Sequence, residues 1–180
     1  MAMLKSGSGI RFLGVSLVVV LLDQFTKHLV MEYIAWNTPG IQLLPCFNLV
    51  HVYNEGAAFS FLANMGGWQR WFFMLVAVAL AAVLTVVLLR TPARKKWTCI
   101  GLALIIGGAL GNLIDRVMLG HVVDFLLFYL KGEDWFWSYP AFNVADMAVC
   151  CGAVLVVLIS FKEPAAGEAD KSKASENRDV

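Results

Sequence analysis

Four long apolar segments restrict this chain to folds that live in a membrane. "WQRWFFMLVAVALAAVLTVVLLR" carries no charge from Trp71 to Leu89, and "WTCIGLALIIGGALGNLIDR" carries none from Trp97 to Ile114. Two further apolar runs cover roughly residues 10–31 and 143–161. Each is about 18 to 22 residues long, enough for a helix to cross a hydrocarbon core of about 30 Å. The sequence therefore predicts a membrane α protein with four transmembrane helices.

Composition and charge exclude the soluble and nucleic-acid-binding classes. Of the 180 residues, 59% are hydrophobic and only 15% are charged, too few for the surface of a soluble domain. The net charge of +1 indicates no nucleic-acid partner. The first apolar run follows basic residues, as a signal peptide does, but it leads into "DQFTKH" rather than a small-residue cleavage site. We interpret it as the first transmembrane helix.

The distribution of Lys and Arg predicts how the chain is oriented. An N-terminus in the cytoplasm places ten basic residues on the inner side and four on the outer side, as the positive-inside rule favours. The inner residues are Lys5, Arg11, Arg90, Arg94, Lys95, Lys96, Lys162, Lys171, Lys173 and Arg178, and the outer ones are Lys27, Arg70, Arg116 and Lys131. Both termini are therefore expected in the cytoplasm.

The segments between and after the spans differ in character. Within residues 32–67, "FNLVHVYN" alternates in the manner of a strand and "NEG" follows as a turn signal, which predicts a small extracytoplasmic β element. Residues 117–142 are interpreted as a link between the third and fourth spans. Residues 162–180 are polar and aperiodic, so we expect a disordered cytoplasmic tail. We expect residues 1–161 to form a single four-helix transmembrane domain.

Two aspartates stand out against the apolar background. Asp124 lies in "HVVDFLLFYL" without a Lys or Arg within six residues on either side. Asp146 is the only charge in "FNVADMAVCCGAVLVVLISF", where Asn143 suits an N-cap and the helix dipole favours a negative charge three residues later. Ionisable groups at membrane depth cost roughly 2.5–3.5 kcal/mol each on insertion scales, so they are functional candidates by default.

Other polar residues near the membrane have a structural interpretation beside the functional one. Asp23 and Lys27 are spaced i, i+4, the favourable order for an ion pair, and Asp115 has Arg116 as an obvious neighbouring partner. Gly108 and Asn112 recur with Asp115 and Arg116 on one helix face, and the Gly107–Gly111 pair allows a second helix to approach closely. These positions are the following: Asp23, Lys27, Gly108, Asn112, Asp115 and Arg116.

Two facing carboxylates at a water–lipid boundary suggest acid–base chemistry. Like-charge repulsion keeps one proton on the pair, so the ionised member can activate water while the protonated member donates to an oxyanion. A rival interpretation is a proton- or cation-coupled carrier, which also uses buried carboxylates but favours positions near the bilayer midplane. A non-enzymatic scaffold is a third interpretation, and it leaves Asp124 without a purpose.

Four ordered blocks add a family resemblance. "LLDQFTKHLV", "VYNEGAAFSFL", "GGALGNLIDRVMLGHVVDFLLFY" and "FNVADMAV" resemble those of bacterial lipoprotein signal peptidase (signal peptidase II), over about residues 12–160. The resemblance implies a four-span aspartyl endopeptidase of the bacterial inner membrane, with its active site at the extracytoplasmic face. It implies a prolipoprotein substrate that is cut before a diacylglyceryl-modified Cys. The expected partners are this substrate and membrane lipids, and the expected state is a monomer.

The resemblance also implies roles for individual residues. Asp124 and Asp146 match the catalytic pair, and four positions match polar residues that line the substrate cleft: Asn54, Asn112, Arg116 and Asn143. Five more match motif positions with a support role: Asp23, Lys27, Gly56, Gly108 and Asp115. No metal and no cofactor are expected. Because the helix dipole favours an ionised Asp146, the hypothesis is that the shared proton rests mainly on Asp124.

Overall fold

Four membrane-spanning helices form the body of the computed structural model, which describes residues 7–56 and 67–162. Within these residues the helices are α1 (Leu13–Tyr33), α2 (Trp68–Arg90), α3 (Lys96–Met118) and α4 (Val144–Lys162). All four are long and apolar enough to cross a bilayer, which confirms the predicted number of spans. A short 3-10 helix, η2 (Gly9–Phe12), precedes α1.

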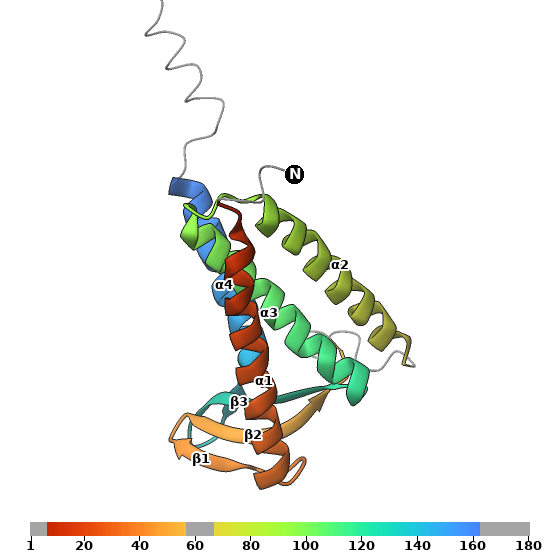
Figure 1. Ribbon diagram of the computed structural model, residues 1–180. Coiled ribbons are helices and arrows are strands. Elements are labelled where there is room, and N and C mark those ends of the chain that lie inside the picture. The colour runs from red at the N-terminus through yellow and green to blue at the C-terminus, as the bar shows by residue number, and fades with distance from the viewer. Residues whose placement is uncertain (1–6, 57–66, 163–180) are drawn as a thin grey trace, which may run out of the picture.

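Helix α3 is the centre of the bundle and packs against each of the other three helices (Figure 1). Its glycines make this possible because they present no side chain to the neighbouring backbones. A Cβ at Gly107 would lie 2.8 Å from the Ser16 carbonyl oxygen of α1, and one at Gly108 would overlap the Ala145 carbonyl oxygen of α4. The close approach predicted for this stretch is confirmed, with α1 on one side and α4 on the other.

Replacing Gly108 by Ala is expected to destabilise the α3–α4 contact by about 1–3 kcal/mol, the usual cost of overpacking. The added Cβ meets backbone rather than a flexible side chain, so the helices must separate. Gly14→Ala is the matched control, since a Cβ there has nothing within 4 Å. Thermal unfolding in detergent checks both variants, and equal midpoints for the two would contradict the close approach.

A four-stranded antiparallel sheet lies at one end of the helices, as Figure 1 shows. Among the described residues its order is β1 (Ile41–Leu44), β2 (Phe47–Asn54), β3 (Val122–Lys131) and β4 (Phe136–Ser138). The predicted β element is confirmed in β2. Residues 117–142 link α3 and α4 as predicted, but they also supply two of the four described strands, which the sequence analysis did not predict. Their apolar run does not alternate, so it carries no strand period.

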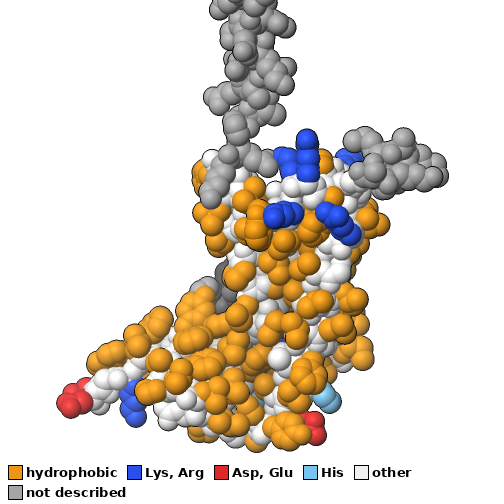
Figure 2. Space-filling view, turned by 60° about the vertical axis from the view of Figure 1, so that its left-hand side comes forward, with side chains coloured by type: hydrophobic (Ala, Val, Ile, Leu, Met, Phe, Trp, Pro, Cys, Tyr) orange, Lys and Arg blue, Asp and Glu red, His pale blue; other side chains and the backbone are white. Residues whose placement is uncertain are grey.

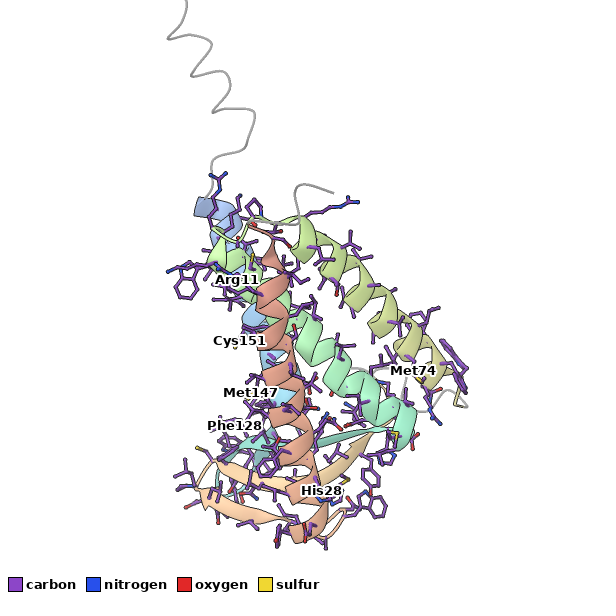
Figure 3. The ribbon with its side chains drawn as sticks, viewed as in Figure 1. Arg11, His28, Met74, Phe128, Met147 and Cys151 are labelled. Carbon is purple, nitrogen blue, oxygen red and sulfur yellow. The ribbon has the colours of Figure 1, made fainter. Side chains whose placement is uncertain are left out.

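The end of α1 covers one face of this sheet. Val30 and Ile34 pack against Val123 and Phe125 of β3, and the Ile34 carbonyl oxygen lies 2.8 Å from Nδ1 of His51 on β2. Figure 3 shows His28 at this end of α1 and Arg11 at the far end. Since successive side chains on a strand point to opposite faces, the contact with Val123 turns Asp124 to the other face.

The end opposite the sheet carries most of the basic side chains, which gather there in Figure 2. The N-terminal segment is tied to the α2–α3 loop by a hydrogen bond of 2.9 Å from the Gly9 N–H to the Thr91 carbonyl, and by the Ser8–Pro92 bridge. Most basic side chains therefore lie at the end of the bundle away from the sheet, as the predicted orientation requires. The cytoplasmic location of both termini remains a prediction. Lys162 still belongs to α4, and the tail expected beyond it lies outside the described residues.

Candidate active site

Asp124 is a carboxylate buried at the junction of the sheet and the helices. Its side chain accepts a hydrogen bond of 3.0 Å from Nδ2 of Asn54 on the neighbouring strand and one of 2.7 Å from Nδ2 of Asn143. The residue is 2% exposed. Burial, and then the nearby charge of Asp146, raise the pKa of Asp124 to about 7, against the hydrogen bonds of the two amides.

Asp146 lies in the first turn of α4 and is held by a reciprocal cap. The Asp146 N–H donates to Oδ1 of Asn143 at 2.9 Å, and the Asn143 N–H donates to Oδ2 of Asp146 at 3.2 Å. This is a capping box built from Asn and Asp, and it confirms the predicted N-cap. The other carboxylate oxygen of Asp146, Oδ1, accepts a hydrogen bond of 2.7 Å from Nδ2 of Asn112 on α3. Both carboxylates are thus solvated by amides.

The amide of Asn143 joins the two carboxylates. Its Oδ1 is committed to Asp146, so its Nδ2 must face the other way, where it donates to Asp124 and, at 3.2 Å, to Oδ1 of Asn112. Asn143 itself is completely buried. The two aspartates, 22 positions apart in the chain, therefore share one asparagine between them, as the sequence-based pairing required.

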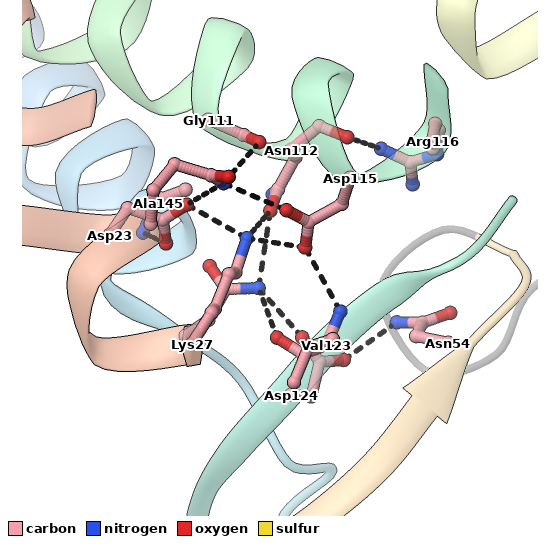
Figure 4. A network of polar contacts seen from close by, with 12 residues as sticks. Asp23, Lys27, Asn54, Gly111, Asn112, Asp115, Arg116, Val123, Asp124 and Ala145 are labelled. Carbon is pink, nitrogen blue, oxygen red and sulfur yellow. Dashed lines mark hydrogen bonds and ion pairs between the residues drawn. The ribbon is translucent and has the colours of Figure 1, made fainter. Parts of the chain in front are cut away.

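A buried ion cluster of Asp23, Lys27 and Asp115 belongs to the same polar network as Asp124, as Figure 4 shows. Lys27 Nζ is 2.8 Å from carboxylate oxygens of both Asp23 and Asp115, and it donates to Oδ1 of Asn112 at 2.9 Å. The predicted Asp23–Lys27 pair is confirmed. The expected pairing of Asp115 with Arg116 is wrong, because α1 brings Lys27 to Asp115 instead.

The two acids of this cluster also hold backbone groups of the site. Asp115 accepts the Val123 N–H at 3.1 Å, directly before Asp124, and Asp23 accepts the Ala145 N–H at 2.9 Å, directly before Asp146. Gln24 was missed by the sequence reasoning: its Nε2 donates to Asp115 at 2.8 Å. A polar residue next to Asp23 within an apolar span was the available signal.

Arg116 approaches the site from the end of α3. Its Nη2 donates 2.9 Å to the Gly56 carbonyl, its guanidinium lies over the Phe73 ring, and its buried Nε has no hydrogen-bond partner among the described residues. The Gly56 N–H in turn donates 3.0 Å to Oδ1 of Asn54, which turns Nδ2 of that amide toward Asp124. Arg70, also missed, holds the end of α3 through the Arg116 carbonyl at 2.8 Å.

The structure thus brings the predicted residues together at the end of the bundle next to the sheet. All but Gly108 contact a carboxylate or a residue that contacts one, and Gly108 acts one turn away by admitting α4. The site is a pair of buried carboxylates held at the end of a bundle of membrane-spanning helices. This arrangement is the one expected of a multi-pass membrane aspartic peptidase.

Comparison with known proteins gives the particular family. The family model described as Signal peptidase (SPase) II matches residues 15–162. The chain is 48% identical to the lipoprotein signal peptidase of Aeromonas hydrophila, over 90% of this chain and 95% of that one. It is 51% identical to that of Ralstonia nicotianae, over 86% and 87%. The chain belongs to the signal peptidase II family, and it is an aspartic peptidase.

Solved structures agree with this fold. A bacterial membrane enzyme solved by the in meso method at 2.3 Å resolution has a TM-score of 0.73 and 27% identity, over 84% of this chain and 88% of that one. A second such structure, at 1.9 Å resolution, has a TM-score of 0.70 and the same identity.

Proposed function

We propose that this protein removes the signal peptides of prolipoproteins, cutting on the N-terminal side of a diacylglyceryl-modified Cys, with Asp124 and Asp146 as the catalytic pair. The single observation that supports this best is the way the two carboxylates are paired. Both are solvated by amide donors, and neither forms an ion pair within residues 7–56 and 67–162. A carboxylate without a cation is free to exchange its proton.

The proposed reaction consumes one water and moves one proton through the pair. The ionised aspartate takes a proton from water as the water oxygen attacks the carbonyl carbon before the Cys. The protonated aspartate donates a hydrogen bond to the oxygen that becomes an oxyanion. When the C–N bond breaks, the Cys nitrogen takes a proton from the pair. The products are a signal-peptide carboxylic acid, which then releases its proton to water, and a free Cys amine, and the pair again holds one proton.

The two aspartates are assigned different roles. Asp146 sits at a helix N-terminus and accepts the backbone N–H of Asn143, which favours its ionised form. Asp124 lies on a strand away from any helix dipole, and burial raises its pKa to about 7. We therefore assign the resting proton to Asp124 and the activation of water to Asp146.

The surrounding polar residues divide into two groups. The amides of Asn54, Asn112 and Asn143 each give an N–H to a carboxylate, so we assign them first to positioning the pair, and then to substrate contact. The Nε of Arg116 is buried and unpaired among the described residues, so we assign Arg116 to a carbonyl of the substrate peptide or its lipid esters.

The setting of the enzyme follows from its helices. It is a multi-pass membrane protein, and we propose the bacterial inner membrane with the site at the extracytoplasmic face, acting as a monomer among bilayer lipids. The carrier alternative is weakened by the position of Asp124, which lies on a strand beyond the helix ends rather than near a bilayer midplane.

The test is a cleavage assay with the purified protein in detergent. A prolipoprotein carrying diacylglyceryl-Cys should yield one new N-terminus, the lipidated Cys, identified by mass spectrometry. The same chain without the lipid is the matched control and should be cut far more slowly, and a metal chelator should change neither result. Cleavage at any other bond would contradict the proposal. If neither chain is cut, proton flux in liposomes tests the carrier instead.

Cleavage is expected to decline as the pH rises through about 7. The raised pKa of Asp124 keeps that carboxyl protonated below this value and ionised above it, and two ionised carboxylates leave no donor for the oxyanion. The measurement is kcat as a function of pH, with the high-pH limb reporting the loss of the shared proton.

The Asn54→Ala variant tests whether the high-pH limb of the kcat profile reports the titration of Asp124. The hydrogen bond from Asn54 lowers the pKa of Asp124, so its removal should move the limb to higher pH. A limb that stays at the same pH in this variant would show that another group titrates.

A further inference from the structure

Helix α3 ends on backbone carbonyls that its own N–H groups do not reach. The Gly120 N–H, which a longer helix would give to the Arg116 carbonyl, donates to the Asp115 carbonyl instead, at 3.3 Å. The missing donors come from another helix. Nε of Arg70 donates 2.8 Å to the Arg116 carbonyl, and its Nη2 donates 3.2 Å to the Val117 carbonyl. Arg70, in the first turn of α2, therefore caps the end of α3.

Arg70 suits this position by its charge and its direction. Its positive charge lies at the negative end of the α3 dipole, and its planar fork presents two N–H groups side by side. An arginine at the end of a span often extends to lipid headgroups, but Arg70 is half-buried and turns these groups toward α3. Figure 1 shows the start of α2 beside the end of α3. Arg70 thus fixes one helix against the other next to the site.

The same turn of α2 also contacts the side chain of Arg116. Phe73 lies three positions after Arg70 and so on the same face of α2. The Arg116 guanidinium lies over the Phe73 ring, 5.4 Å from its centroid. On its other sides, Nη1 donates 3.4 Å to the Asn112 carbonyl and Nη2 donates 2.9 Å to the Gly56 carbonyl. Helix α2 therefore holds Arg116 both at its backbone and at its guanidinium.

Arg116 needs such support because its side chain is long and carries the group that we assign to the substrate. A free arginine must give up many rotamers when it binds, and this loss weakens binding. Both Nη groups already donate to carbonyls of the enzyme, whereas Nε is buried and has no hydrogen-bond partner in the described part of the chain. The direction of Nε depends on how the guanidinium lies, and Phe73 limits it on one side.

We propose that Arg70 is a positioning residue, which fixes the first turn of α2 to the end of α3 and thereby directs Nε of Arg116 toward a substrate carbonyl. This inference rests on the proposed function, which gives Arg116 its substrate. Arg70 itself contacts backbone of the enzyme, so it acts on the reaction only through Arg116.

A double-mutant cycle tests whether Arg70 acts through Arg116. The four enzymes are the wild type, Arg70→Met, Arg116→Met and the double variant, all assayed with the lipidated prolipoprotein. Arg70→Met should raise KM about tenfold and keep kcat within about twofold, because the hydrogen bond assigned to Arg116 binds substrate and moves no proton. In the Arg116→Met background the same substitution should change KM by less than about twofold, since no guanidinium is left to position.

Two further variants distinguish positioning from simple support of the fold. Arg90→Met, at the other end of α2, is the matched control and should leave KM unchanged. Arg70→Lys should raise KM less than Arg70→Met, because its ammonium still gives the α3 carbonyls a cation and a donor, and it replaces Arg70→Met in the cycle if that variant does not fold. An equal effect of Arg70→Met in both backgrounds, or a lower kcat at an unchanged KM, would overturn the proposal.

NMR of the arginine Nε–H groups gives a second measurement that needs no substrate. In detergent-solubilised protein with isotopically labelled arginine, the signal that disappears in Arg116→Met belongs to Arg116. The Phe73 ring current acts on this guanidinium, so Arg70→Met should move the Arg116 signal, and Arg90→Met should not. A signal that stays in place in Arg70→Met would overturn the positioning role and leave the peptidase function intact. A wild type that cuts no lipidated substrate would overturn the proposed function and, with it, the target of Arg116.

Discussion

Asp124→Asn and Asp146→Asn are each expected to lower the rate of cleavage by about 10²–10⁴-fold or more. Asparagine has nearly the shape of aspartate, but its amide can neither give up a proton as an acid nor take one from water as a base. Either substitution therefore removes one half of the acid–base pair. Single-turnover cleavage of the lipidated prolipoprotein measures the loss without interference from product release.

The controls must distinguish a loss of catalysis from a loss of stability, since Asp146 also caps helix α4. At position 146 an amide oxygen still accepts one of the two N–H groups that hold the start of α4, so the fold should survive. At position 124 the new NH₂ group faces the amides of Asn54 and Asn143, which should cost some stability. Unfolding midpoints are therefore measured beside the rates.

Asp134→Asn provides the matched substitution. Asp134 is exposed between β3 and β4, so its variant should cut at the wild-type rate. Activity retained in a folded Asp124→Asn or Asp146→Asn enzyme would return that residue to a structural role.

The sequence predicts the helices and marks Asp124 and Asp146 as candidate residues for physical reasons, whereas their role as a catalytic pair is what the family resemblance implies. Uncharged runs such as Trp71–Leu89 satisfy their backbone hydrogen bonds only as helices in a bilayer, so length and hydropathy define the spans. Asp124 stands out because an isolated carboxylate in an apolar run is costly, and Asn143 with Asp146 has the spacing of a cap. These arguments need only local sequence.

The remaining features depend on contacts that local sequence does not carry. Strand β3 is apolar on both faces, because Val123 and Phe125 pack against α1 on one face and Phe128 and Leu130 lie on the other, so its alternation is lost. Asp115 has Arg116 beside it in sequence, yet the glycines of α3 let α1 approach and present Lys27. The partner of a buried charge is decided by which helices touch, and neighbouring positions on one helix point in different directions.

Lys27→Met is the second large expected effect, a loss of about 3–5 kcal/mol of stability, the usual cost of removing one partner of a buried ion pair. Lys27 is 1% exposed, and its ammonium is the ion-pair partner of Asp23 and Asp115. Methionine has a similar length and fills the same space, so the loss reports the charge rather than a cavity. Thermal unfolding in detergent is the measurement, with Lys131→Met, an exposed lysine, as the matched control.

The double variant Lys27→Met/Asp115→Asn distinguishes a charge effect from a packing effect. With one carboxylate neutralised, the buried cluster returns to the wild-type net charge of −1, since Asp23 and Asp115 contribute −2 and Lys27 contributes +1. The double variant should therefore be more stable than Lys27→Met alone, and a further loss would contradict the electrostatic account. Cleavage activity should not recover together with stability, because the Lys27 ammonium can only donate hydrogen bonds. It fixes Oδ1 of Asn112 toward itself and thereby Nδ2 toward Asp146, an orientation that methionine cannot impose.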